Sequence, residues 1–364
     1  MQKYWRTPPA LVLSTPGKVD PGQECMIDVV SAFLRLGYGV NLVSVSEAPQ
    51  VYEYHMSIDD ATQLRALMRC GDVLGCLLHA EGCAITPSVD SDFLVSVPRR
   101  NRGAVYLGDV QHGAESVRTL ANLGISTAGK IVSVNIASAP HMLIAGATGS
   151  GKSVALNTIL CSLLLSATPG DMRVIMIDPK RVEMSQYAGL PHLFIPIATS
   201  VPDALHALDI AVREMANRYA FLQKYGFRDA RQARIPALII VIDELADLMM
   251  TSRKRAEESI VRIAQLGRAA GVHLIVATQK PVVSVVTGLI QANIPCKLAL
   301  KTSSVQDSVR ILGHKGADNL LGMGDALLKL PDSVDPVRMQ CAITPDKDIL
   351  RIVNHWKYNS VFEA

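Results

Sequence analysis

The segment Gly146-Ala-Thr-Gly-Ser-Gly-Lys152-Ser153 combines glycines with a lysine and a hydroxyl at the spacing GxxxxGK[ST]. Glycines let a backbone wrap around a pyrophosphate, successive N–H groups bind its oxygens, and the N-terminus of a following helix adds positive charge. Lys152 would then reach the β- and γ-phosphates, and the Ser153 hydroxyl would bind Mg²⁺. The predicted nucleotide-binding residues are Gly146, Ala147, Thr148, Gly149, Ser150, Gly151, Lys152, Ser153 and Val154.

The sequence on either side fits such a site. The apolar run Met142–Ala145 predicts a buried strand before the loop, and Leu156, Ile159, Leu160 and Leu163 predict the apolar face of a helix after it. The alternative is a glycine-rich turn that binds nothing. The strand–loop–helix context favours a phosphate-binding loop.

A second apolar run, Leu238–Ile242, ends in the adjacent acids Asp243 and Glu244. Asp243 would hold Mg²⁺ through water, and Glu244 would polarise the attacking water as a general base. The alternative is that these acids only cap the next helix. The Asn-Lys-x-Asp pattern of guanine recognition is absent, so ATP is the predicted nucleotide.

Two further side chains are candidates for the same reaction. Gln279 follows the apolar run Leu274–Thr278 and would sense the γ-phosphate or position water; the less favoured alternative is a solvent-exposed amide at a strand end. Arg268 lies just before that run and could be an arginine finger presented to a neighbouring subunit, or a solvated residue at a helix end.

The arrangement of apolar runs predicts an α/β fold. Short runs without two-residue alternation are typical of strands buried on both faces of a parallel sheet. They occur at Met142–Ala145, Val174–Ile177, Leu238–Ile242, Leu274–Ala277 and Leu298–Leu300. An amphipathic helix is predicted after Pro202–Asp203, and a short closing helix over Asp346–Trp356. We predict a P-loop NTPase (RecA-like) domain over residues 136–364 and a small α+β domain, dominated by hairpins, over residues 1–135.

Composition limits the classes of protein that fit. Among 364 residues, 49% are hydrophobic and the net charge is +3, which excludes wholesale disorder but does not by itself indicate a polyanionic partner. The seven cysteines, without CxxC spacing, predict reduced thiols and argue against zinc. No run is long enough to span a bilayer and no signal peptide is evident, so we expect a soluble, cytoplasmic chain.

Taken together, these motifs resemble the FtsK/SpoIIIE family of ring-forming double-stranded DNA translocases, within the FtsK–HerA superfamily. The resemblance covers nearly the whole chain, and Val51, Tyr52 and Glu53 match part of the family's smaller ring domain. The motor-domain matches are His141–Val154, Met176–Lys180, Gly189–Leu193, Ile242–Met250, Arg268–His273, Ala277–Pro281, Thr287–Pro295 and Leu321–Asp325.

The resemblance implies a homo-hexameric motor around duplex DNA that hydrolyses ATP, with Mg²⁺, between neighbouring subunits. Lys152 and Ser153 would bind phosphate and magnesium, Asp243 and Glu244 would be the Walker B pair, Gln279 the sensor, and Arg268 the finger acting in trans. The family's membrane anchor and DNA-reading winged-helix domain have no counterpart in this sequence, so neither septal anchoring nor directional loading is inferred.

Several positions expected to face DNA have lost a positive charge. Gln291, Val305 and Val309 stand where the family has Lys or Arg, which would weaken the salt dependence of DNA binding. The remaining predicted DNA contacts are Lys280, Lys297, Lys301 and Arg310, with Lys315 nearby. The run Arg253-Lys254-Arg255 could add charge or be a solvated helix face.

Two functions therefore remain open. One is an ATP-driven DNA translocase. The other is a related ATPase of a conjugation, secretion or packaging machine that acts on a protein or nucleoprotein and has a membrane or machinery partner protein. Stimulation of ATP hydrolysis by duplex DNA would favour the first, and stimulation by a partner protein the second. A nucleotide-binding scaffold without turnover is disfavoured because Lys152, Glu244 and Gln279 are all present.

Overall fold

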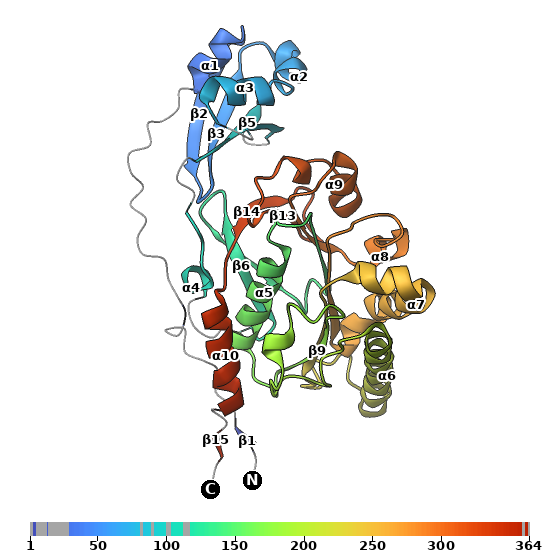
Figure 1. Cartoon of the computed structure of the whole chain (residues 1–364). Helices are drawn as coiled ribbons and strands as arrows, with labels where there is room; N and C mark the ends of the chain where they lie inside the picture. Colours follow the sequence, from blue (N-terminus) through green and yellow to red (C-terminus); the bar gives the residue numbers. More distant parts are fainter. Residues whose placement is uncertain are drawn as a thin grey trace.

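The protein folds around one large sheet and one small sheet, which form two domains (Figure 1). The computed structural model describes residues 3–4, 13, 29–80, 83–88, 91–99, 103–111, 117–358 and 361–362. Near the chain ends, β1 (Lys3–Tyr4) pairs antiparallel with β15 (Val361–Phe362).

The large sheet has nine strands in the order β7-β6-β14-β13-β12-β8-β11-β10-β9. Five neighbouring strands are parallel, and four more extend the sheet in antiparallel fashion. The parallel strands are β12 (Cys296–Leu300), β8 (His141–Ala145), β11 (Val272–Thr278), β10 (Ala237–Ile242) and β9 (Met172–Ile177). The antiparallel strands are β13 (Asp325–Lys329), β14 (Val337–Cys341), β6 (Leu120–Ser126) and β7 (Ile131–Asn135).

The five parallel strands are the five that the apolar runs predict. Their residues are almost all buried, because helices cover both faces of this part of the sheet. The predicted P-loop fold is confirmed. The antiparallel extension was not predicted, because its strands mix buried and partly exposed residues and are less uniformly apolar than the parallel strands.

Two sets of helices form the layers on either side of the sheet (Figure 1). On one face pack α5 (Lys152–Ser166) and α10 (Asp346–Tyr358), whose Trp356 is buried beside α5 and donates its indole N–H to the Leu164 carbonyl at 2.9 Å. The other face is covered by α6 (Val201–Tyr225), α7 (Leu245–Ala270), α8 (Gly288–Asn293) and α9 (Val305–Leu312). The predicted helix after Pro202 and the predicted closing helix are both present.

The small domain has its own core. Its four-stranded antiparallel sheet, in the order β2-β3-β5-β4, packs against α1, and Phe33 of that helix meets Phe93 of β5 edge to face. Its elements are α1 (Val29–Arg35), β2 (Val40–Glu47), β3 (Val51–Ile58), α2 (Leu64–Leu67), α3 (Gly71–Leu78), β4 (Ala84–Pro87) and β5 (Phe93–Pro98).

The pairing of the strands bears on the predicted division of the chain at residue 135. Strand β6 pairs with β14 of the large sheet, β7 pairs with β6, and α4 (Leu107–Val110) packs into the same core. We therefore propose a boundary between β5 and α4. A short hairpin looks the same in sequence whichever sheet it joins, so only strand pairing reveals where it belongs.

Two further expectations concern the chain as a whole. Within the described ranges no helix is long and apolar enough to cross a membrane. Six cysteines are free thiols, and the seventh, Cys25, lies outside the described residues.

Candidate functional site: a phosphate loop and three strand ends

The loop Gly146–Ser153 joins β8 to α5 at the carboxyl edge of the parallel strands. Gly151, the residue before the helix, has φ 102°, and a Cβ built on it would lie 2.7 Å from the backbone nitrogen of Gly324. Only glycine fits there, because the backbone has a positive φ and the Gly324 backbone leaves no room for a Cβ. All nine predicted nucleotide-binding residues lie in this loop and the first turn of α5.

Lys152 and Asp243 meet across the site. The Lys152 Nζ donates to the backbone carbonyl of Asp243 at 2.6 Å and to its Oδ1 at 2.9 Å, and both side chains are buried. The sheet order β8-β11-β10 brings these residues together from distant parts of the chain. The lysine ammonium is thus held on the side of the loop where the Walker B strand ends.

Glu244 caps the next helix and also bonds to the end of β11, and its role as a general base stays a prediction. Its Oε1 accepts the Ala246 N–H at 3.3 Å, so it caps α7. The same oxygen accepts the Thr278 hydroxyl at 2.6 Å, and the carboxylate also accepts the Gln279 backbone N–H at 3.2–3.3 Å. Although Glu244 is only 3% exposed, these donors stabilise its charge and fix its orientation beside the phosphate loop.

Gln279 also lies at the loop. Its Oε1 accepts the hydroxyl of Thr148 at 2.8 Å, so the tip of β11 is joined directly to the phosphate-binding segment. This contact argues against a free solvent-exposed amide.

Lys180 is a residue of this site that sequence reasoning left without a role. It follows β9, and its Nζ lies 3.8 Å from Glu244 Oε2 and 3.6 Å from Asp247 Oδ2. The sequence feature that could have identified Lys180 is its position two residues after Asp178, at the carboxyl end of a buried strand. That position matters only once β9 is known to lie beside β10.

Arg268 is not in this cluster. It is exposed in the last turn of α7, next to the start of β11, and therefore lies at the opposite, amino edge of the sheet. At about 1.5 Å per residue, the 24 positions from Glu244 to Arg268 correspond to roughly 36 Å of helix, with a kink at Ser252. It cannot reach the phosphate loop of its own subunit.

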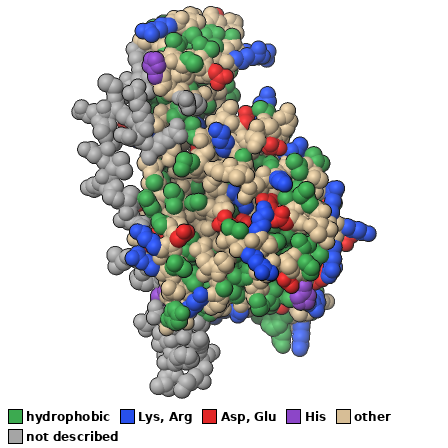
Figure 2. Space-filling model, in the orientation of Figure 1, with side chains coloured by type: hydrophobic (Ala, Val, Ile, Leu, Met, Phe, Trp, Pro, Cys, Tyr) green, Lys and Arg blue, Asp and Glu red, His purple; other side chains and the backbone are tan. Residues whose placement is uncertain are grey.

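The four predicted DNA contacts differ in their surroundings. Lys280 and Lys301 are exposed, but Lys297 is half-buried on β12, where burial and the neighbouring Lys329 lower its pKa. Arg310 is held by the Pro281 carbonyl at 2.9 Å and by Asp307 at 3.1 Å. On the face shown in Figure 2, Lys and Arg side chains are interspersed with Asp and Glu rather than gathered in one patch.

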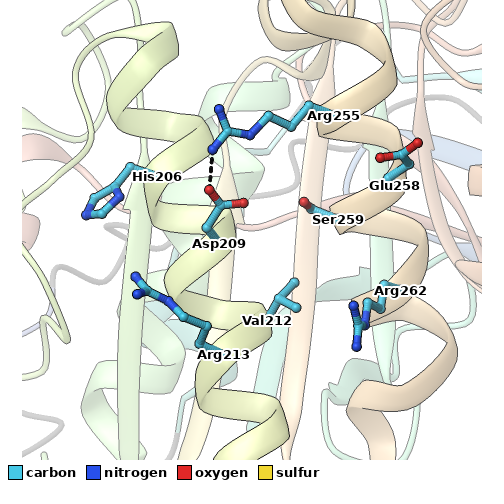
Figure 3. Close-up of a pocket in the computed structure, with 8 residues that line it drawn as sticks. All are labelled: His206, Asp209, Val212, Arg213, Arg255, Glu258, Ser259 and Arg262. Atoms are coloured by element: carbon cyan, nitrogen blue, oxygen red, sulfur yellow. Dashed lines mark hydrogen bonds and ion pairs between the residues drawn. The ribbon is translucent and has the colours of Figure 1, made fainter.

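A groove of about 570 Å³ lies between α6 and α7, away from the phosphate loop (Figure 3). Arg255 forms an ion pair with Asp209 across it, and Arg253 lies 3.7 Å from Glu257 on α7. Two of the three cations in the run 253–255 thus already have carboxylate partners. The other polar residues lining the groove are His206, Arg213, Glu258, Ser259 and Arg262.

The residues present fit a magnesium nucleotide. The Ser150 Oγ is buried at the loop without a hydrogen-bond partner, as expected of a group that awaits a phosphate oxygen. Ser153 and Asp243 offer the hard oxygen ligands that Mg²⁺ prefers. Among the described residues, no cluster of His, Cys, Asp and Glu forms a separate metal site.

Comparison with known proteins agrees with this geometry. The family model described as FtsK/SpoIIIE matches residues 108–234 and 228–283. The chain belongs to the FtsK/SpoIIIE family. It is 36% identical to the DNA translocase FtsK of Streptomyces coelicolor over 96% of its own length and 41% of that relative. It is also 36% identical to the DNA translocase FtsK of Tropheryma whipplei, over 93% of its own length and 49% of that relative.

This FtsK/SpoIIIE protein therefore spans less than half the length of these two curated relatives. Among solved structures it resembles the pCW3 conjugation coupling protein TcpA with ATPγS, at a TM-score of 0.64 and 22% identity over 90% of this chain and 98% of that one. It also resembles the type VII secretion ATPase EccC of Thermomonospora curvata, at a TM-score of 0.57 and 25% identity over 69% of this chain and 32% of that one. The predicted family and fold are both confirmed.

Proposed function

We propose that this chain is the motor of an ATP-driven double-stranded DNA translocase, which hydrolyses ATP between the subunits of a ring. The observation that carries the proposal is the convergence of Lys152, Glu244 and Gln279 on one phosphate loop. The curated relatives that match almost the whole chain are named DNA translocases, which supports DNA as the track.

Each residue of the cluster has a distinct task in hydrolysis. The loop N–H groups and Lys152 bind the phosphates, and the Glu244 carboxylate takes a proton from the attacking water. Gln279 holds that water or the γ-phosphate in line. Ser153 and Asp243 would hold Mg²⁺, which neutralises charge on the β- and γ-phosphate oxygens.

A hydrogen-bonded connection leads from the reacting group to the surface. The Thr278 hydroxyl donates to Glu244 and accepts the Lys280 backbone N–H at 3.1 Å. The carbonyl of the next residue, Pro281, accepts a hydrogen bond from the Arg310 side chain of α9. The Arg310 carbonyl in turn accepts one from the Gln291 side chain of α8. We propose that loss of the γ-phosphate moves this loop and the two helices, and that Lys280 makes the contact with the track.

The position of Arg268 supports a ring, given its proposed role as an arginine finger. An exposed arginine at the far edge of the sheet can complete a nucleotide site only on a neighbouring subunit. A closed ring of identical subunits, six by the family resemblance, supplies such a neighbour for every site. A duplex DNA track would place this activity in the cytoplasm.

A second candidate is an ATPase of a conjugation, secretion or packaging machine. It is favoured by the neutral side chains on α8 and α9, where Gln291 is used to bind the Arg310 carbonyl and Val309 is exposed. These helices adjoin the loop after β11, so they are the surface on which a track would act. A protein or nucleoprotein track would not need their missing charges.

The test is steady-state ATP hydrolysis with and without linear duplex DNA, at low and moderate salt, with Lys152→Ala as the blank. We expect stimulation by DNA that falls as salt rises and disappears in the blank. Turnover that ignores DNA would contradict the translocase and direct the search to a partner protein. Absence of turnover under every condition would contradict both candidates.

A further inference from the structure

The sheet order fixes the direction in which a bound nucleotide must lie. The strands run β13-β12-β8-β11-β10, and the groups that act on the γ-phosphate follow β11 and β10. The phosphate chain crosses the loop after β8. The end of the chain that carries the ribose and base must therefore lie on the side of β12 and β13. Two segments lie there at the carboxyl edge of the parallel strands: the residue after β12 and the loop before β13. They are neighbours because Leu300 at the end of β12 pairs with Ala326 near the start of the antiparallel strand β13.

The first segment is the loop Gly322-Met323-Gly324. All three residues have positive φ, at 86°, 49° and 91°. The Gly324 N–H donates to the Ser150 carbonyl at 2.8 Å, and its own carbonyl accepts the Cys341 N–H at 2.8 Å. The loop is thus bonded directly to the phosphate loop on one side and to β14 on the other.

Met323 is the unusual residue of this loop. A methionine rarely adopts a left-handed backbone, because its Cβ crowds the neighbouring carbonyl. Here the side chain of Gln340 holds the Met323 carbonyl at 2.9 Å, and the Met323 side chain is 80% exposed. The fold therefore fixes the backbone and presents an apolar, polarizable side chain to the solvent beside the phosphate loop.

The second segment is Lys301. Its carbonyl accepts the Ala147 N–H of the phosphate loop at 2.8 Å. Its Cδ lies 3.7 Å from where a Cβ on Gly322 would stand, so the exposed side chain runs along the Met323 loop. A lysine in this position borders the nucleotide site.

We propose that Met323 and Lys301 form the wall of the nucleotide site on the side of the base. Met323 packs its thioether against the flat face of the nucleobase, and Lys301 places its ammonium at the ribose end of the phosphate chain. The inference rests on the proposed ATP site, and it reassigns Lys301 from the DNA track to the nucleotide.

The test compares binding of a non-hydrolysable ATP analogue with binding of inorganic tripolyphosphate, which lacks base and ribose, by calorimetry on the full chain. Met323→Asn removes the apolar side chain but tolerates positive φ. We expect it to weaken binding of the analogue about tenfold and to leave binding of tripolyphosphate unchanged. Met250→Gln, which alters an exposed methionine on α7, is the matched control and should change neither.

Lys301→Gln should weaken both ligands and leave the salt dependence of DNA stimulation unchanged. The proposal is overturned if Met323→Asn weakens both ligands equally or neither, or if Lys301→Gln changes only the response to DNA. If the unmodified chain binds neither ligand, the proposed ATP site itself is wrong and this inference falls with it. If the unmodified chain binds both ligands but the variants do not show the expected effects, only the proposed roles of Met323 and Lys301 are refuted, and the ATP site stands.

Discussion

Lys152 and Asp243 form a buried ion pair, with the lysine Nζ 2.9 Å from the aspartate Oδ1. Each carboxylate or ammonium that is buried depends on its partner, because water cannot solvate it there. Lys152, the proposed phosphate-binding lysine, is therefore also a structural counterion of Asp243. Its removal affects stability as well as chemistry.

Lys152→Ala should abolish ATP hydrolysis and also destabilise the fold, by about 3–5 kcal/mol, because it leaves Asp243 buried and unpaired. Chemical denaturation and an ATPase assay measure the two effects. Adding Asp243→Asn should restore part of the lost stability and none of the activity. An unchanged stability in Lys152→Ala would argue that the ion pair contributes nothing.

Thr278 should control the orientation of Glu244. Thr278→Val keeps the shape of the side chain but removes the hydroxyl that donates to Glu244 at 2.6 Å. We expect kcat to fall about tenfold with little change in KM, as for a group that positions a general base. Thr158→Val, which removes a buried hydroxyl bonded to Ala342 at 2.8 Å, should lower stability without this loss of kcat.

The contact between Thr148 and Gln279 makes it possible to separate two roles of Gln279, holding the loop and sensing the γ-phosphate. Thr148→Val and Gln279→Ala each break the 2.8 Å hydrogen bond. If Gln279 acts only by holding the loop, the two variants and their combination should give the same rate. If it senses the γ-phosphate as proposed, Gln279→Ala should slow hydrolysis at least about tenfold more than Thr148→Val, and steady-state kinetics decides between these results.

Arg268 should act on the nucleotide of a neighbouring subunit. Arg268→Ala and Glu244→Gln should each be inactive alone, because each removes one half of every shared site. When the two proteins are mixed and allowed to reassemble, some interfaces regain an intact Arg268 and an intact Glu244. Partial recovery of ATP hydrolysis is the expected result, and full ATPase activity in Arg268→Ala alone would remove the assignment.

Stability should fall as the pH drops below about 6.5, because buried imidazoles resist protonation. The pKa of His192 is lowered from 6.5 to about 4, chiefly by burial; the hydrogen bond to Ala167 and the nearby Asp171 oppose this shift, and Arg173 adds to it. Between these two values the unfolded chain binds a proton that the folded chain does not. Each such histidine therefore costs up to about 1.4 kcal/mol of stability per pH unit in this window.

His192→Gln, which retains a donor towards the Ala167 carbonyl, should reduce that pH dependence. His206→Gln alters an exposed histidine of α6 and should leave it unchanged. Denaturant melts at pH 7 and pH 5 give the comparison. Identical pH dependence in the two variants would contradict a neutral, buried His192.

The parallel core and the chemistry of the loop could be predicted from the sequence. Runs such as Leu238–Ile242 are apolar throughout because both faces of those strands are buried, and this leaves a pattern that does not depend on distant partners. The residues of the phosphate loop are similarly local, since glycines, lysine and serine must follow one another to wrap one pyrophosphate. Position in the chain was sufficient to predict their roles.

What the sequence could not decide depends on residues far apart in the chain. The hairpin β6–β7 joins the large sheet through β14, more than two hundred positions away. Lys180 becomes part of the site only because β9 lies beside β10, and Lys301 and Met323 lie at the phosphate loop only because β12 and β13 pair next to β8. The local sequence pattern indicates which residues are buried. The order in which strands pair decides which distant residues become neighbours, and it is fixed by tertiary packing.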